Sequence, residues 1–143
     1  MKSCSFKVIG KIRGKSRPRF NFKSKTAYSC KNDKIFENTF REAHRASGGF
    51  RFDDNDYIKA EIDLYFAIPK SYSKKRRQAC LVGEEKPAKK PDIDNVLKNI
   101  FDAGNEHLYK DDIQIVECIC RKHYTDELED YMIIKMEEIK WED

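Results

Sequence analysis

Residues 57–68 read YIKAEIDLYFAI, and this stretch decides the fold. Apolar side chains occupy every second position, and mostly polar ones fill the positions between them. The apolar positions are Ile58, Ala60, Ile62, Leu64, Phe66 and Ile68. Because successive side chains of a strand point to opposite faces, this period of two predicts a β-strand that buries one face. Pro69 ends it.

Patterns on both sides of this strand predict a mixed β-sheet with flanking helices. Further strands are predicted over 6–13, 113–124 and 131–139, and helices over 33–47 and 91–105. A short acidic loop joins the last two strands, which favours an antiparallel hairpin. Residues 70–90 are strongly basic and are typical of a short helix or a loop. We therefore expect one α+β domain over residues 1–143.

The size and composition of the chain fit a folded cytoplasmic protein. Its 143 residues are about one domain's worth. No run approaches the roughly 18–20 uninterrupted apolar residues of a membrane-spanning helix, so no membrane partner is expected. The five cysteines are an odd number in a chain large enough to fold without disulfides. They favour reduced thiols and hence the cytoplasm.

Positive charge is concentrated in the first third of the sequence. Residues 1–52 hold 14 Lys/Arg and 3 Asp/Glu, a net charge of +11, whereas the remainder carries −7. Clustered cations attract polyanions through counterion release, whatever the overall charge. The candidate DNA-binding residues are Arg17, Arg19, Lys23, Lys25, Lys74, Lys75, Arg76 and Arg77. The alternative is that these cations are only solvated surface loops.

Acidic residues flank the predicted helix 91–105. Asp92 and Asp94 stand at its start, and Asp112 follows at the beginning of the next strand, where the loop could bring it alongside them. Three neighbouring carboxylates repel one another unless a cation lies between them. Oxygen ligands favour Mg²⁺ or Mn²⁺, and a water on such an ion can attack phosphorus. Lys98 is four residues after Asp94, on the same helix face, and could stabilise the developing charge.

The same residues have a purely structural explanation. Acidic residues are common at helix starts, where they cap free N–H groups and complement the helix dipole. Asp94 and Lys98 are also spaced for an ordinary surface ion pair. Spacing alone does not decide between a metal site and a helix cap.

Three motifs resemble the central signature of the RusA family of Holliday-junction resolvases. They are KPDIDNVLK at residues 90–98, FDA at 101–103 and YKDDIQIV at 109–116. Upstream, GKSRPR at 14–19 and Tyr28 are similar to the basic Pro-Arg element that these proteins carry after their first strand. The resemblance therefore spans most of the chain.

The resemblance implies a function and a set of site residues. Asp92, Asp94 and Asp112 would bind Mg²⁺, with Mn²⁺ as a substitute, and Lys98 would be the catalytic lysine. Asp111 stays open as the third ligand instead of Asp112, because this spacing varies by a residue. A homodimer would nick two strands of four-way junction DNA in recombination and repair. A non-catalytic DNA- or RNA-binding module, or a metal nuclease for other branched DNA, are the alternatives.

Overall fold

The computed structural model describes residues 1–16, 19–21, 23–24, 26–28 and 31–140. The strands are β1 (Ser3–Ile9), β2 (Arg19–Asn21), β3 (Thr26–Tyr28), β4 (Tyr57–Ala67), β5 (Ile115–Thr125) and β6 (Tyr131–Ile139). The helices are α1 (Lys31–Ala46), α2 (Lys74–Leu81), α3 (Ile93–Gly104) and the short 3₁₀ helix η1 (Asp112–Gln114). The predicted α+β arrangement is confirmed. None of the helices in the described residues is long and apolar enough to span a membrane.

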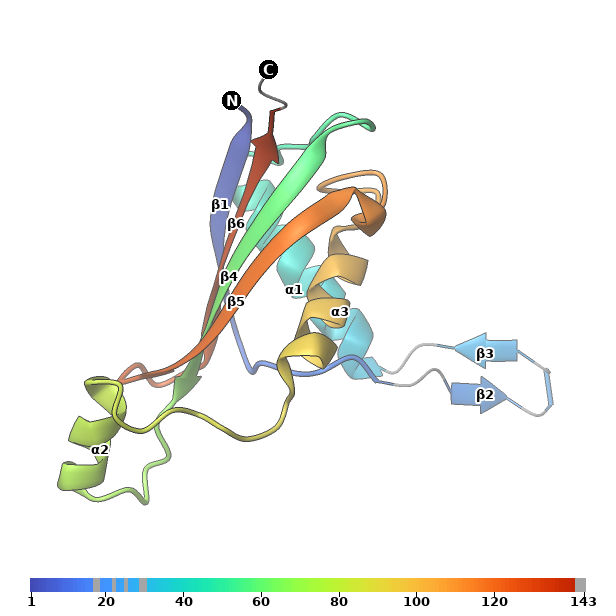
Figure 1. Cartoon of the computed structure of the whole chain (residues 1–143). Helices are drawn as coiled ribbons and strands as arrows, with labels where there is room; N and C mark the ends of the chain where they lie inside the picture. The colour runs from blue at the N-terminus through green and yellow to red at the C-terminus, as the bar shows by residue number, and fades with distance from the viewer. Residues whose placement is uncertain (17–18, 22, 25, 29–30, 141–143) are drawn as a thin grey trace.

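The main sheet has four strands in the order β1-β6-β4-β5, and α1 and α3 lie on one of its faces (Figure 1). Helix α2 lies beyond one end of the sheet. Strands β2 and β3 form a separate antiparallel pair that stands away from the helices. This pair was not predicted, because three-residue strands are too short to show a period.

Strand β4 is the centre of the core, as residues 57–68 predict. Its alternate side chains from Ile58 to Phe66 are at most 4% exposed and face the helices. Phe36 and Phe40 on α1, and Val96 and Ile100 on α3, are buried in the same cluster. Burial of each such side chain contributes about 1.5–3 kcal/mol relative to exposure, so this face fixes both helices on the sheet.

The predicted hairpin of the last two strands is wrong. Strand β4 lies between them, parallel to β5 and antiparallel to β6. The connection instead passes the end of β4 and is held there by Asp130. Its carboxylate accepts hydrogen bonds from the backbone N–H of Ala67 (2.8 Å) and of Ile12 (3.2 Å). Strands that are consecutive in sequence often pair. The alternation of apolar and polar side chains does not show that a third strand lies between them.

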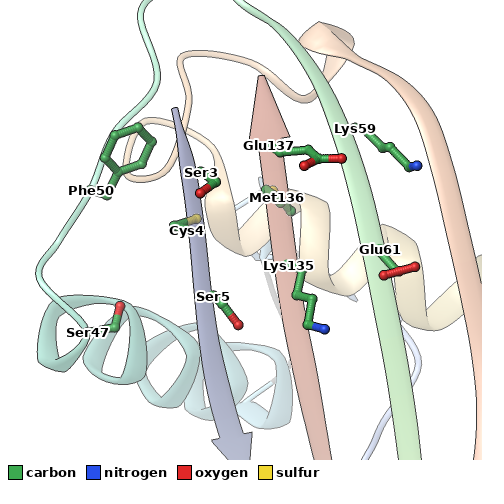
Figure 2. A pocket seen from close by; sticks show the side chains of 10 residues that line it. All are labelled: Ser3, Cys4, Ser5, Ser47, Phe50, Lys59, Glu61, Lys135, Met136 and Glu137. Carbon is green, nitrogen blue, oxygen red and sulfur yellow. The ribbon is translucent and has the colours of Figure 1, made fainter. Parts of the chain in front are cut away.

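The face of the sheet opposite the helices is polar. Figure 2 shows Lys59 and Glu61 on β4 beside Lys135 and Glu137 on β6. In the strand register Lys59 is opposite Glu137 and Glu61 is opposite Lys135. These residues help to line a hollow of about 490 Å³ in which positive and negative side chains alternate.

The C-terminal end of α3 is firmly anchored. Tyr109 is fully buried, and its hydroxyl donates a 2.7 Å hydrogen bond to the carbonyl of Phe101. Its ring lies directly against Gly104, where an added Cβ would come within 2.6 Å of the phenol oxygen and 2.8 Å of Cζ. The amide of Gln114 donates to the carbonyls of Asp53 (3.0 Å) and Asp56 (3.1 Å). The position of η1 relative to α3 is therefore fixed.

Gly104→Ala should destabilise the fold. Alanine favours helix by up to about 1 kcal/mol over glycine, but overlap with a buried ring costs about 1–3 kcal/mol. We expect a net loss in the free energy of unfolding, measured by urea denaturation. Tyr109→Phe removes the nearest atom, so the loss should be smaller in that background. A Gly104→Ala variant as stable as the parent chain would contradict this packing.

Candidate active site

The start of α3 carries charged side chains that form no cap and no ion pair among the described residues. Asp92 is the N-cap residue, yet its side chain makes no capping hydrogen bond. Asp92, Asp94 and Lys98 are exposed, and within the described residues none of them takes part in an ion pair. The cap and the Asp94–Lys98 pair are therefore missing, and of the structural explanation only the match of the two acids to the helix dipole remains. The three charges remain available to a ligand.

Asp112 lies at the other end of α3. Its backbone N–H donates to the side-chain oxygen of Asn105 (2.9 Å), just beyond the last turn. Asp111 is used differently, because its carboxylate caps η1 by accepting a 3.1 Å hydrogen bond from the N–H of Ile113. Partial burial raises the pKa of the Asp112 carboxyl, and the neighbouring acids Asp111 and Asp102 raise it further.

The structure does not bring Asp112 alongside Asp92 and Asp94. Helix α3 has 12 residues and is about 18 Å long, and the two acidic groups lie at its opposite ends. Within the described part of the chain, no three His, Cys, Asp or Glu side chains are placed to hold one metal ion. The expectation that the loop folds back is thus not met within one chain. Asp92 and Asp94 remain as a pair of oxygen ligands.

Residues 13–15 form a seam along α3. The backbone N–H of Lys15 donates to the carbonyl of Asn95 (3.1 Å), and the side chain of Asn99 donates to the carbonyl of Arg13 (3.2 Å). The ammonium of Lys15 lies 3.5 Å from the carboxylate of Asp102. Gly14 fits so tightly that an added Cβ would overlap the side chain of Asn95. The segment that leads to β2 is therefore fixed to the start of α3.

A positively charged pocket lies beside Asp92. Its volume is about 460 Å³, and residues 11–16 and the beginnings of α1 and α3 line it. Lys11, Arg13 and Lys90 line it as exposed side chains, and the described residues offer none of them an ion-pair partner. Sequence reasoning missed these three cations. Lys11 and Arg13 could have been proposed from the sequence, because they lie in its basic first third.

This pocket differs from the hollow on the open face of the sheet (Figure 2). There, Lys59 and Lys135 stand among Glu61 and Glu137, so the local charge is balanced. An anion gains little from a balanced surface, whereas uncompensated cations attract it. The pocket beside Asp92 is accordingly the better place for a phosphate.

The predicted DNA-binding residues fall into three groups. Arg17 and Lys25 lie outside the described residues, Arg19 lies in β2, and Lys23 is exposed in the turn before β3. On α2, the guanidinium of Arg76 lies 2.9 Å from Glu85, and that of Arg77 lies 2.8 Å from Asp126. These two arginines are neutralised within the chain. Lys74 and Lys75 are exposed and have no ion pair among the residues described.

Comparison with known proteins decides the family. The model of the family described as "Endodeoxyribonuclease RusA" matches residues 10–136. The chain belongs to the RusA endodeoxyribonuclease family. The match includes both ends of α3, the basic seam and the pocket beside Asp92. The predicted resemblance is thereby confirmed.

One curated relative is similar over part of this RusA chain. It is "Uncharacterized protein YqaN" of Bacillus subtilis (strain 168), 38% identical over 72 residues. The similar region covers 49% of this chain and 51% of the relative, so the chain spans about half the length of the curated protein that it matches.

Asp112→Asn should stabilise this RusA chain at neutral pH. The fold raises the pKa of Asp112, so its contribution to stability is fully present below the unfolded pKa and is lost as pH rises through the folded pKa. Removing the charge should raise the melting temperature at pH 7 by no more than about 3 °C, because solvent screens a partly exposed group. The gain should shrink as the pH approaches 3.

Calorimetry at pH 3 and pH 7 measures both changes. Glu129→Gln is the matched control, because Glu129 is exposed and has no hydrogen bond or ion pair among the described residues. A lower melting temperature for Asp112→Asn at pH 7 would contradict the repulsion at this end of α3.

Proposed function

We propose that this chain is a Mg²⁺-dependent endonuclease that resolves four-way DNA junctions in recombination and repair. The observation that carries the proposal is the set of free charges at the start of α3. Among the described residues, no side-chain cap and no ion pair uses Asp92, Asp94 or Lys98, so their charges are open to a metal ion and a phosphate. Membership of an endodeoxyribonuclease family supplies the chemistry that such residues perform.

Each free side chain has a proposed role. Asp92 and Asp94 offer the carboxylate oxygens that Mg²⁺ prefers, and Mg²⁺ commonly uses one or two carboxylates together with substrate phosphate oxygens. The ion, when bound, supplies Lewis acidity at the phosphodiester. Lys98 is one turn along the same face and holds positive charge where negative charge grows on the phosphoryl oxygens. Neither acid after the helix is assigned a role here, because Asp111 already caps η1 and Asp112 lies at the opposite end of α3 from Asp92 and Asp94.

The cationic pocket beside Asp92 is the proposed seat of a neighbouring DNA phosphate. The pocket is lined by Lys11, Arg13 and Lys90, which have no ion-pair partner among the described residues. Their positive charges are therefore open to a phosphate. The seam of residues 13–15 holds these cations at a fixed position relative to Asp92. Binding at the pocket therefore orients the strand that is cut.

Two active sites suit the proposed substrate. A four-way junction has approximate two-fold symmetry, and so has a homodimer. A pair of identical sites can then cut two related strands, which one site alone cannot do in a single binding event.

Asp92→Asn and Asp94→Asn should abolish cleavage of four-way junctions. Loss of a ligand for the catalytic ion removes several kcal/mol of transition-state stabilisation, which is about 1000-fold or more in rate. Lys98→Ala should cost about 100- to 1000-fold. Junction binding should persist in the two Asp variants, since a lost carboxylate reduces repulsion of phosphates.

Cleavage of labelled four-way, three-way and linear DNA in Mg²⁺ measures this prediction. Parent-like cutting by either Asp variant would overturn the assignment of these residues. Equal cutting of three-way DNA would favour the nuclease for other branched DNA. No cutting by the parent chain, together with no response of DNA affinity to Mg²⁺, would favour the binding module.

Lys11→Ala combined with Arg13→Ala should reduce the salt dependence of junction binding. Each lost phosphate contact lowers the slope of log affinity against log salt by about 0.9, so the double variant should lose about 1.8. Fluorescence anisotropy without metal measures the slope. Lys135→Ala is the control, because Lys135 is exposed on the open face of the sheet. Equal slopes for the double variant and the control would remove the pocket from the DNA interface.

A further inference from the structure

We propose that the free edge of β1 binds an acidic, extended segment of a partner protein as an added β-strand. The surface consists of the edge of β1, an apolar hollow between β1 and α1, and the cations at the end of that hollow, and we call it the β1 edge groove. Asp92, Asp94 and Lys98 do not line it. Binding of the segment therefore does not depend on nuclease activity.

Strand β1 lies at one edge of the main sheet (Figure 1), where β6 is its only partner among the described strands. At the two ends of this antiparallel pair, the N–H of Gly10 donates to the carbonyl of Asp130 (2.9 Å), and the N–H of Glu138 donates to the carbonyl of Lys2 (2.8 Å). Backbone groups in such a pair point alternately toward and away from the partner strand. The even-numbered residues therefore face β6, and the odd-numbered ones point their N–H and C=O groups outward. The outward residues are Ser3, Ser5, Lys7 and Ile9.

The edge of β1 has few of the features that keep sheet edges from pairing. The strand contains no proline, and its register with β6 is unbroken, whereas the register of β5 with β4 contains a shift. Lys7 is its only charged residue, and the ammonium lies over the ring of Tyr131, 4.2 Å from the centroid. Strand β5, at the other edge, carries Glu117, Arg121 and Lys122. The edge of β1 is thus the one better suited to accept a further strand.

An apolar hollow of about 230 Å³ lies between the end of β1 and α1. Ile9 on β1 and Ile35 on α1 are each 53% exposed at this hollow, and Val8, Phe36 and Met132 line it more deeply. Side chains of a strand alternate between its two faces, so every second side chain of an added strand would point to the helix side of the sheet. An apolar side chain there would enter the hollow and cover the two exposed isoleucines.

The charges at the hollow select an acidic segment. Lys11 and Arg13 line it as exposed cations, and neither has an ion-pair partner in the part of the chain that the structure describes. The described lining includes no acidic residue. Nucleic acid matches the cations but not the apolar lining or the strand edge. A segment with apolar side chains beside β1 and carboxylates beside Lys11 and Arg13 matches all three.

The groove shares residues with the pocket beside Asp92, because Lys11, Arg13 and Asn32 line both. An acidic segment in the groove would occupy cations that the proposed function gives to a DNA phosphate. Its binding should therefore lower the affinity for junction DNA, and the groove would act as a regulatory surface. This consequence rests on the proposed function, whereas the addition of a strand to β1 does not.

A fluorescein-labelled synthetic peptide tests the groove by fluorescence anisotropy. The probe has three aspartates followed by alternating isoleucine and threonine. In antiparallel pairing it begins beside Ile9, so its aspartates lie near Lys11 and Arg13. Ile35→Glu places a carboxylate at the hollow and should weaken binding by at least about 10-fold.

Val82→Glu is the matched control, because Val82 is similarly exposed (57%) and lies outside the hollow. Its affinity for the peptide should stay within about 2-fold of the parent value. An equal loss in both variants would overturn the groove as the binding site. Equal affinity for a peptide with lysines in place of the aspartates would overturn the acidic partner.

Amide hydrogen exchange, followed for single residues by NMR, tests the added strand directly. Saturating peptide should slow exchange at the outward N–H groups of Ser5, Lys7 and Ile9 by at least about 10-fold. The N–H groups of Phe6 and Val8 already face β6 and should change little. Peptide binding without this alternation would overturn strand addition.

Two other occupants of the edge give different exchange patterns. Slowing of the outward amides by a rise in protein concentration alone would mean that a second copy pairs with β1. Slowing by a single-stranded oligonucleotide, and not by the peptide, would mean that the surface binds nucleic acid. Either result would overturn the acidic protein segment as the occupant.

Junction binding at saturating peptide checks the shared cations. We expect the Kd for four-way junction DNA to rise by about 10-fold or more. An unchanged Kd would show that the acidic end does not lie on Lys11 and Arg13, and would overturn the charge match. A parent chain that cuts no junction would overturn the proposed nuclease function and leave the groove standing.

Discussion

The packing of α3 against the buried face of β4 is the constraint on which the rest of the structure depends. The alternating apolar residues of β4 form a flat surface, and α3 lies on it through Val96 and Ile100. This contact fixes the position of every charged residue on the helix. Asp92 and Asp94 lie at the start of α3, and Asp112 lies just beyond its end. Nothing in the local sequence could change that separation without dismantling the core.

The acidic residues Asp92, Asp94 and Asp112 at the two ends of this helix are not paired with basic side chains among the described residues. Asp92 is at the N-cap position, but its side chain makes no capping hydrogen bond. Asp112 lies near the carboxylates of Asp111 and Asp102. Several other charged groups of the chain are neutralised by close partners. Arg76 with Glu85, Arg77 with Asp126 and Lys2 with Asp56 all form close pairs. The contrast sets the unpaired charges of α3 apart from the charges that form ion pairs elsewhere in the described chain.

Much of the fold could be predicted from the sequence because its periods are strong. Residues 57–68 were predicted as a strand and 33–47 and 91–105 as helices, and the structure has β4, α1 and α3 there. In these segments burial and local preference favour the same structure. The predicted hairpin failed because alternation reveals which face of a strand is buried and says nothing about which strand lies beside it. The insertion of β4 between β5 and β6 depends on contacts distant in sequence, such as that of Asp130 with Ala67.

The candidate site, too, could be predicted only in part from the sequence. The acids at the start of α3 could be identified because they adjoin a helix boundary and match a family motif. Their distance from Asp112 could not, because it depends on whether the chain turns back after α3 or continues to η1. The cations of the pocket beside Asp92 were also missed, since Lys11 and Lys90 are far apart in sequence and meet only through the seam.

The seam between residues 13–15 and α3 has a mechanical consequence. Lys15 and Asn99 fasten the segment that continues into the β2–β3 pair, which projects from the body of the protein (Figure 1). Moving this segment away from the helix would break the hydrogen bond from the Lys15 N–H to the Asn95 carbonyl, beside the first turn of α3. It would also open the close contact between Gly14 and the side chain of Asn95. The path that the chain takes after β1 is therefore set by the same helix turn that follows Asp92 and carries Asp94.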